Sequence, residues 1–169
     1  YGSSPEITFG VNLGFQWKGF EVSALLQGAA NVSLYLKQSA VCPLYYTRSA
    51  QKWHMGRWTE ERYLAGEKIT YPRILSDNIS SPSFLDQNPL STFWLYDASY
   101  LRLRNLEIAY TLKSKTLKNS GISSIRLYVS GTNLFTITGM ENFDPEAPSG
   151  IGSFYPMQKV YNVGVKLVF

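Results

Sequence analysis

The sequence predicts an all-β fold in which antiparallel up-and-down strands form part of a large transmembrane β-barrel. Three observations predict this fold class. Apolar and polar side chains alternate along several stretches, as they do in strands with one apolar face. Aromatic residues make up 15% of the chain and charged residues only 17%, a balance that favours strands over a helical bundle. Short and long connections alternate between the predicted strands, which indicates one rim that carries the long loops.

The first two strands are expected over residues 6–17 and 19–35. Every second residue from Ile7 to Trp17 is apolar, and the pattern resumes with the opposite parity at Phe20. Two alternating runs around a short turn that contains glycine predict a β-hairpin. Trp17 and Phe20 flank this turn, as aromatic residues do where a barrel strand crosses the membrane interface.

The segment over 37–95 follows a different pattern. It has no sustained period and carries several prolines and large aromatic residues. More than fifty residues without regular structure are too long for an ordinary connection inside a compact domain. Outer-membrane barrels have long extracellular loops and short periplasmic turns, so we expect 37–95 to be a long extracellular loop.

Two further strands are expected over 96–112 and 124–136, joined by a short polar segment. The apolar parity changes from odd at Leu103 to even at Leu106. A β-bulge near Arg104-Asn105 would supply the extra residue and keep one apolar face. A second extracellular loop, of medium length, is expected over 138–158.

The last strand is expected over 159–169 and alternates regularly. Its 11 residues, at ~3.3 Å each and tilted by ~40°, span ~28 Å, close to the apolar band of an outer-membrane barrel. We expect one parity to face lipid and to carry the assembly signal of the barrel. These residues are Tyr161, Val163, Val165, Leu167 and Phe169. An ordinary strand of a β-sandwich is the alternative that this pattern leaves open.

Several classes of protein are disfavoured by composition. The chain has no run of eighteen apolar residues and a mean hydropathy of −0.14, so we expect no transmembrane helix. With one cysteine and one histidine, we expect no metal site, no cofactor and no enzyme activity. The net charge of +4 is scattered along the chain, so a nucleic-acid partner is not expected. Five strands cannot close a barrel, which needs at least ~8 strands, so we expect the chain to be a segment of the wall of a larger barrel.

Several motifs are distributed throughout the chain, at 97–112, 125–135, Asp144-Pro145-Glu146, Arg57-Trp58-Thr59, Tyr71-Pro72-Arg73, Thr8-Phe9-Gly10 and Trp17-Lys18-Gly19-Phe20. In sequence and in order, these motifs resemble those of SusC/RagA-type TonB-linked outer-membrane transporters. One departure lies at 140–143, where the family more often runs directly from Thr-Gly into an aromatic residue and Asp-Pro-Glu. We interpret this difference as a short insertion in a loop.

The resemblance implies that residues 1–169 are the C-terminal segment of a barrel of about 22 strands in the outer membrane of a Gram-negative bacterium. It implies an importer of nutrients, either oligosaccharides or peptides. In that family an N-terminal plug fills the lumen and a TonB box couples import to the proton-motive force. TonB is therefore an expected partner, through an N-terminal region outside this sequence. A SusD-like lipoprotein is the expected partner at the extracellular mouth, and lipid is expected around the apolar face.

Two groups of residues are candidate sites in such a barrel. Four charged residues lie opposite the apolar parity or close to its change and are expected to face the lumen: Arg102, Arg104, Glu107 and Arg126. We interpret them chiefly as residues that solvate the wall or pair with the plug, with substrate contact as the alternative. Candidates for contact between the loops and a partner or substrate are Trp53, Arg57, Trp58, Tyr63, Tyr71, Asp144 and Glu146.

Each loop candidate has a structural alternative. The aromatic residues are also the ones that a long ordered loop needs for a small core of its own. Asp144 before Pro145 favours a turn over a metal site, because too few oxygen ligands accompany it. Two other functions stay open at this point: a soluble β-sandwich that binds carbohydrate, and a passive porin-like barrel.

Overall fold

The computed structural model describes residues 1–41, 49–74, 91–113, 121–152, 154–155 and 157–169. The chain divides into two compact units. The first, here called the sheet unit, contains Tyr1–Val32, Ala98–Gly139 and Met157–Phe169. The second, here called the loop unit, contains Ser33–Asp97 and Met140–Pro156. Among the described helices, all are too short or too polar to cross a membrane.

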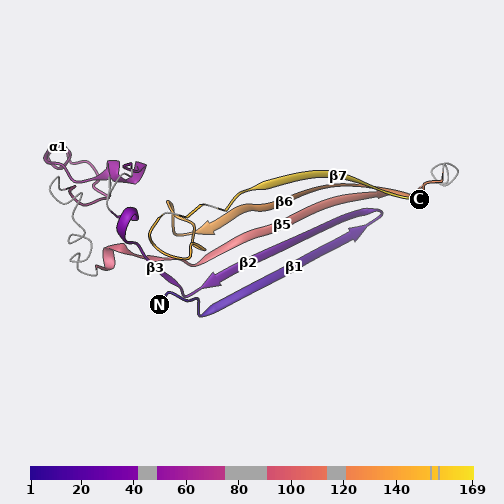
Figure 1. Ribbon diagram of the computed structural model, residues 1–169, viewed down its shortest axis with the longest axis horizontal. Coiled ribbons are helices and arrows are strands. Elements are labelled where there is room, and N and C mark those ends of the chain that lie inside the picture. The colour runs from indigo at the N-terminus through magenta and orange to yellow at the C-terminus, as the bar shows by residue number, and fades with distance from the viewer. Residues whose placement is uncertain (42–48, 75–90, 114–120, 153, 156) are drawn as a thin grey trace. The chain divides into compact units, whose positions relative to one another are not determined.

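The sheet unit is one antiparallel sheet of five strands (Figure 1). In spatial order the strands are β1 (Ile7–Trp17), β2 (Phe20–Ala30), β5 (Tyr100–Leu112), β6 (Ser124–Thr138) and β7 (Val160–Val168). Each strand is paired with a neighbour over nine or more residues. Within the described residues, β1 and β7 each keep one edge without a partner strand. Such edges invite pairing with further strands.

A two-residue turn joins β1 to β2. Lys18 and Gly19 both have positive φ, at 43° and 91°, and Trp17 pairs with Phe20 across them. Positive φ at both central residues is the geometry of a type I′ turn, whose twist matches that of the strands it joins. The neighbouring strand braces the turn, because the Thr111 amide donates a hydrogen bond of 2.8 Å to the Gly19 carbonyl.

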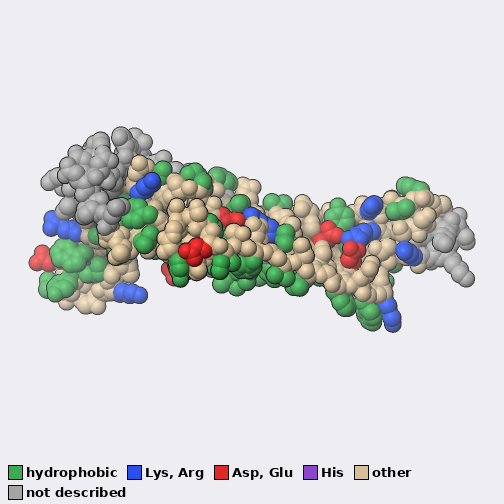
Figure 2. Space-filling view, turned by 90° about the horizontal axis from the view of Figure 1, so that it is seen from below, with side chains coloured by type: hydrophobic (Ala, Val, Ile, Leu, Met, Phe, Trp, Pro, Cys, Tyr) green, Lys and Arg blue, Asp and Glu red, His purple; other side chains and the backbone are tan. Residues whose placement is uncertain are grey.

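The strand registers place most apolar side chains of the five strands on one side of the sheet, here called the apolar face. One row across the sheet illustrates this alignment: Phe15, Val22, Ile108, Val129 and Val163. These side chains lack a covering layer, since Phe15 is 62% exposed and Val163 is 81% exposed. Figure 2 shows hydrophobic side chains along the margins of the view, with charged side chains in the region between them.

The predicted β-bulge is confirmed. The pairings of β5 with β2 and with β6 both shift register at Arg104, which has no direct partner in either ladder. On the β6 side, Asn133 takes a positive φ of 53° at the same level. Because of this shift, Leu103 and Leu106 lie on the same face although their parities differ.

Two expected strands are each divided in the structure. The strand expected over 19–35 ends at Ala30, because Asn31 has a φ of 55°, a conformation that asparagine tolerates well. The following β3 (Ser33–Tyr35) pairs with β4 (Leu95–Asp97) in a separate two-stranded sheet. The strand expected over 96–112 is likewise divided between β4 and β5.

Other strand limits differ by a few residues. β6, expected over 124–136, continues to Thr138, because Tyr100 and Leu101 of β5 extend the ladder. The medium loop, expected over 138–158, therefore begins after Thr138. The last strand, expected over 159–169, is observed over Val160–Val168.

The long segment expected to lack regular structure contains short helices. Their bounds are Gln38–Ala40 (η1), Lys52–Gly56 (η2), Glu60–Leu64 (α1) and Thr92–Trp94 (η4). Thr59 caps α1, because its Oγ1 accepts a hydrogen bond of 3.3 Å from the Arg62 amide. Helices of three to five residues give no hydrophobic period that a sequence pattern would reveal.

We predict that Gly19→Val destabilises the sheet unit. A left-handed backbone costs a residue with a Cβ about 1–2 kcal/mol, and the new Cβ would lie 2.8 Å from the Thr111 carbonyl oxygen. Gly14→Val is the matched control, because nothing lies within 4 Å of a Cβ at that position. Thermal unfolding should show a lower midpoint for Gly19→Val alone; equal midpoints for both variants would contradict the turn assignment.

Candidate functional site

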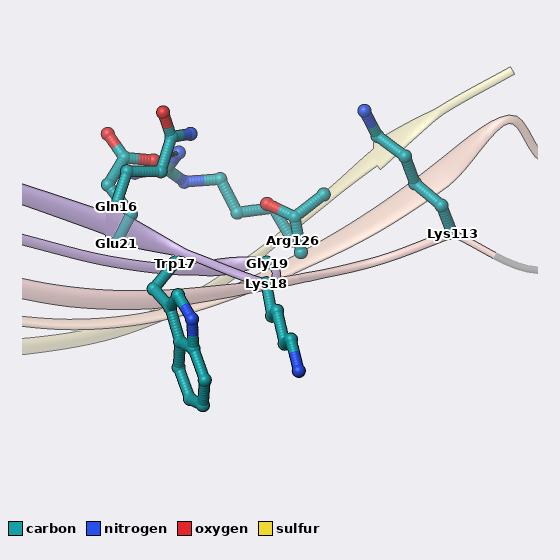
Figure 3. Close-up of a pocket in the computed structure, with 8 residues that line it drawn as sticks. Gln16, Trp17, Lys18, Gly19, Glu21, Lys113 and Arg126 are labelled. Carbon is teal, nitrogen blue, oxygen red and sulfur yellow. Dashed lines mark hydrogen bonds and ion pairs between the residues drawn. The ribbon is translucent and has the colours of Figure 1, made fainter.

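The side of the sheet opposite the apolar face, here called the polar face, holds the charged residues of the strands. Arg126 pairs in register with Thr111 and Lys166, and Glu107 pairs with Ser23 and Ser130. In Figure 3, Gln16, Glu21 and Arg126 lie on one side of the ribbon, whereas Trp17 and Lys18 lie on the other. The polar face is therefore a distinct surface on which charged groups of different strands meet.

Arg126 on β6 joins three strands through its guanidinium. Its Nη2 donates to Glu107 Oε1 of β5 at 2.6 Å, and its Nη1 donates to Glu21 Oε2 of β2. The three side chains are 27–38% exposed, so water screens each ion pair. The geometry nonetheless gives Arg126 one orientation, because a planar fork that holds two carboxylates has little freedom to rotate.

The other two predicted arginines also bridge strands. Arg104 donates to Gln27 Oε1 at 2.9 Å and to Asn133 Oδ1 at 3.2 Å. Arg102 is 2% exposed and donates to Thr136 Oγ1 at 2.9 Å. Each arginine at or beside the bulge is thus tied to a polar side chain of an adjacent strand.

A pocket of about 380 Å³ lies at the end of the sheet that carries the β1–β2 turn (Figure 3). Its lining residues are Gln16, Trp17, Lys18, Gly19, Glu21, Thr111, Lys113 and Arg126. The lining contains charges of both signs but no cysteine, serine or histidine that could act as a nucleophile or base. In the part of the chain that the structure describes, no cluster of three or more His, Cys, Asp or Glu side chains is suited to hold a metal ion.

The loop unit has an aromatic core centred on His54, which is 1% exposed. The His54 and Tyr71 rings lie 4.7 Å apart, the Tyr71 and Trp94 rings 5.6 Å apart, and the Trp53 and Phe143 rings 4.9 Å apart. His54 Nδ1 accepts a hydrogen bond of 2.8 Å from the Gln51 amide, which fixes the start of η2. Burial lowers the pKa of His54, and the Ala40 backbone opposes this shift only in part.

The loop candidates separate into buried and exposed residues. Tyr71 is 7% exposed and its hydroxyl donates to the Val41 carbonyl, so it packs inside the loop unit and presents no surface to a partner. Trp53 is half-buried against Phe143, and Arg57 forms a backbone bridge with Tyr71. Trp58 and Tyr63 are 36% and 64% exposed and have ring centroids 6.5 Å apart.

Asp144 and Glu146 belong to a turn. Asp144 Oδ1 accepts a hydrogen bond of 3.0 Å from the Glu146 amide, and the Asp144 carbonyl accepts one of 3.0 Å from Ala147. This is the arrangement expected of an aspartate that stabilises a turn through its own backbone two residues ahead. The turn interpretation is therefore supported over metal binding.

Sequence reasoning missed four residues of these sites: Glu21, Gln27, Asn133 and His54. Glu21 and Gln27 lie on the polar parity of β2, which was a usable signal, but their partners are 105 and 77 residues away in sequence. No local pattern marks His54 as a buried residue, because η2 is too short to show a period.

We predict that acid pH destabilises the loop unit through His54. Its pKa is lowered on folding, so below the ordinary value of 6.5 the unfolded chain binds a proton that the folded chain does not. The free energy of unfolding then falls by up to about 1.4 kcal/mol for each unit of decreasing pH, and is independent of this group above ~pH 7.5.

His54→Asn isolates this effect, because an amide oxygen can replace Nδ1 as acceptor for Gln51 but does not titrate. Limited proteolysis of 49–74 between pH 7.5 and 5 should accelerate in the unchanged protein and stay flat in the variant. The same acceleration in both proteins would show that another group is responsible.

Curated relatives of the chain are TonB-dependent receptors. TonB-dependent receptor P3 of Formosa agariphila is 26% identical over 179 residues, which cover 98% of the chain and 16% of that protein. TonB-dependent receptor SusC of Bacteroides thetaiotaomicron is 31% identical over 83 residues, which cover 47% of the chain and 8% of that protein. The chain thus spans less than a fifth of the length of these relatives. No family model matches the chain.

Solved structures give the same relationship. The structure of the RagAB peptide importer in the open-open state aligns with 99% of the chain and 17% of its own chain, at a TM-score of 0.70 and 29% identity. A second structure, of the RagAB peptide transporter, aligns with 98% of the chain at a TM-score of 0.70 and 28% identity. Together with the antiparallel sheet, these matches show that the chain is similar to part of the β-barrel of SusC/RagA-like TonB-dependent transporters.

Proposed function

We propose that the chain supplies wall, loops and assembly signal to an outer-membrane importer of nutrients. The observation that carries this proposal is the contrast between the two faces of one sheet. Side chains such as Phe15 and Val163 are exposed along the apolar face, whereas Arg126 and its carboxylate partners occupy the polar face. The wall of a membrane barrel needs an apolar face toward lipid and a polar face toward the water-filled interior.

In the proposed barrel the polar face lines the lumen. Arg102, Arg104, Glu107 and Arg126 would face it, with Arg126 and Glu107 joined in an ion pair and the other two arginines hydrogen-bonded to polar side chains of neighbouring strands. A lumen wall whose charges are already partnered suits passage of varied cargo or contact with a plug better than tight binding of one ligand.

The proposed partners follow from the related proteins. One relative is named SusC, and the solved neighbours are named RagAB peptide importer and transporter. We extend this to a SusD-like surface lipoprotein over the loops, to TonB through the N-terminal region, and to a cargo of oligosaccharides or peptides. In the loop unit, Trp58 and Tyr63 are the exposed aromatic candidates for contact with lipoprotein or cargo, in line with the enrichment of such residues at interface hot spots.

The alternative of a soluble sandwich is disfavoured by exposure. A sandwich buries the apolar side of its sheet beneath a second sheet. Along the apolar face of the described chain, Leu13, Val129 and Tyr161 are 53–70% exposed, so no such layer covers them.

A passive porin-like barrel would share this apolar face. Cargo uptake that continues after deletion of TonB would favour the porin-like barrel, whereas loss of uptake supports the importer.

Val163→Lys tests the lipid-facing side directly. Val163 is 81% exposed near the middle of β7, where a lysine facing lipid costs about 2–4 kcal/mol. Asn162→Lys is the matched control, because it places the same charge one residue away on the polar face. We expect lower amounts of folded transporter in the outer membrane for Val163→Lys alone. Equal amounts of folded transporter for both variants would contradict the proposed orientation of the sheet.

Phe169→Asp tests the proposed assembly signal of Tyr161, Val163, Val165, Leu167 and Phe169. Phe169 is 81% exposed and follows β7 on the apolar parity. We expect slow or failed barrel assembly in the full transporter, measured as the fraction that resists denaturation by detergent without heating. Val168→Asp places the same charge on the other parity and should assemble. If both variants assemble at the normal rate, the signal does not lie in this strand.

A further inference from the structure

We propose that Lys18 and Trp17 form a headgroup site that binds the phosphate of a membrane phospholipid at the β1–β2 turn. The inference deepens the proposed function and rests on it, because it requires the apolar face to meet lipid. It concerns a surface that the transport of cargo does not use.

The first observation is where Lys18 points. Figure 3 shows the Lys18 and Trp17 side chains on the same side of the ribbon, opposite Glu21, Gln16 and Arg126. The Lys18 ammonium lies 5.0 Å from the centroid of the Trp17 ring. A lysine next to a carboxylate-bearing strand would ordinarily turn toward that carboxylate, but Glu21 is already bonded to Arg126. Within the described residues Lys18 makes no ion pair, so its charge is available to a ligand.

The second observation is the backbone of Lys18. Its φ of 43° places it in the left-handed region, where type I′ turns strongly prefer asparagine, aspartate or glycine. Lysine is therefore less favourable for the stability of the turn than asparagine, aspartate or glycine would be. A strained residue at a surface is a reason to look for a function of its side chain.

The third observation is the aromatic belt around the lysine. Trp17 pairs with Phe20 across the turn, and the Phe20 and Tyr110 rings are 4.4 Å apart on adjacent strands. Trp17 is 57% and Phe20 is 48% exposed. Aromatic residues form such belts at the level of lipid headgroups, with the apolar part of the ring in the acyl region and the polar tip in contact with water or headgroups.

These observations together select the ligand. The apolar face below the belt suits acyl chains, and the single positive charge beside Trp17 suits one negative group at the level where those chains end. A phosphodiester headgroup is the group that combines both features. Cation–π contact with Trp17 also holds the ammonium at this level, whereas a free lysine side chain would extend into water.

The test uses the full transporter in maltoside micelles and hydrogen–deuterium exchange of a peptide that covers residues 15–22. Phosphatidylglycerol is the probe, and diacylglycerol, which lacks the phosphate, is its control. We expect phosphatidylglycerol to slow exchange at the turn and diacylglycerol to have no such effect. Slowing by inorganic phosphate alone would overturn the proposal in favour of a simple ion site.

Lys18→Asn removes the charge and supplies a residue that the turn prefers, so a weaker effect of lipid cannot be blamed on a weaker turn. We expect it to raise the phosphatidylglycerol concentration for half-maximal slowing about fivefold, the ratio expected for one lysine at a lipid surface. Lys113→Asn is the matched control, since Lys113 lies at the same end of the sheet but points away from Trp17 and Lys18 (Figure 3). An equal response in the two variants would overturn the proposal.

A second comparison separates this inference from the function on which it rests. If Val163→Lys lowers the amount of folded transporter and Asn162→Lys does not, but Lys18→Asn leaves the response to phosphatidylglycerol unchanged, only the headgroup site is wrong. If Val163→Lys and Asn162→Lys give equal amounts of folded transporter, the lipid-facing orientation itself is wrong.

Discussion

The register that keeps most apolar side chains of five strands on one side of the sheet is the constraint on which the rest of the structure depends. A slip of one residue in any ladder would turn a whole strand's apolar set to the opposite face. The bulge at Arg104 shows how closely this register is kept. The apolar parity of β5 changes within the strand, and the extra residue restores Leu103 and Leu106 to one face.

The polar face depends on that register in turn. Arg126 can reach Glu21 and Glu107 only because β2, β5 and β6 are aligned so that these three side chains project from one face near one end of the sheet. The ion pairs contribute little to stability individually, because water reaches them. Their larger effect is electrostatic balance, since the guanidinium between two carboxylates leaves these three side chains with a net charge of −1, whereas the two carboxylates alone would carry −2.

Much of the sheet could be predicted from sequence because a period of two is a local signal. The hairpin from Ile7 to Ala30, the bulge and the last strand all follow from alternating residues and a turn with glycine. The break at Asn31 could not be predicted in this way, because the apolar pattern continues weakly beyond it into Leu34. Its cause is a single left-handed residue and a pairing with Leu95–Asp97, more than sixty residues away in sequence.

Less of the candidate sites than of the sheet could be predicted from the sequence. Parity marked Arg102, Glu107 and Arg126 as residues of the polar face, but nothing in sequence joins Arg126 to Glu21. In the loop unit, a list of aromatic residues did not distinguish Tyr71, which is buried, from Tyr63, which is exposed. That difference depends on how helices of three to five residues pack against one another, and such helices leave no periodic pattern.

Aromatic residues occupy two different environments in this chain, the exposed apolar face of the sheet unit and the buried core of the loop unit. Trp17 lies in a strand with a strict period of two and is 57% exposed, whereas Trp94 lies in η4 without such a period and is 8% exposed. In the proposed barrel the apolar area of the sheet unit would face lipid, so it would need no cover from the chain itself. The loop unit instead packs the Tyr71 and Trp94 rings into a core around His54, which removes their apolar area from water. The strand period thus places Trp17 on an open apolar face, whereas Trp94 packs against Tyr71 in the core around His54 and Tyr63 of the same unit stays exposed.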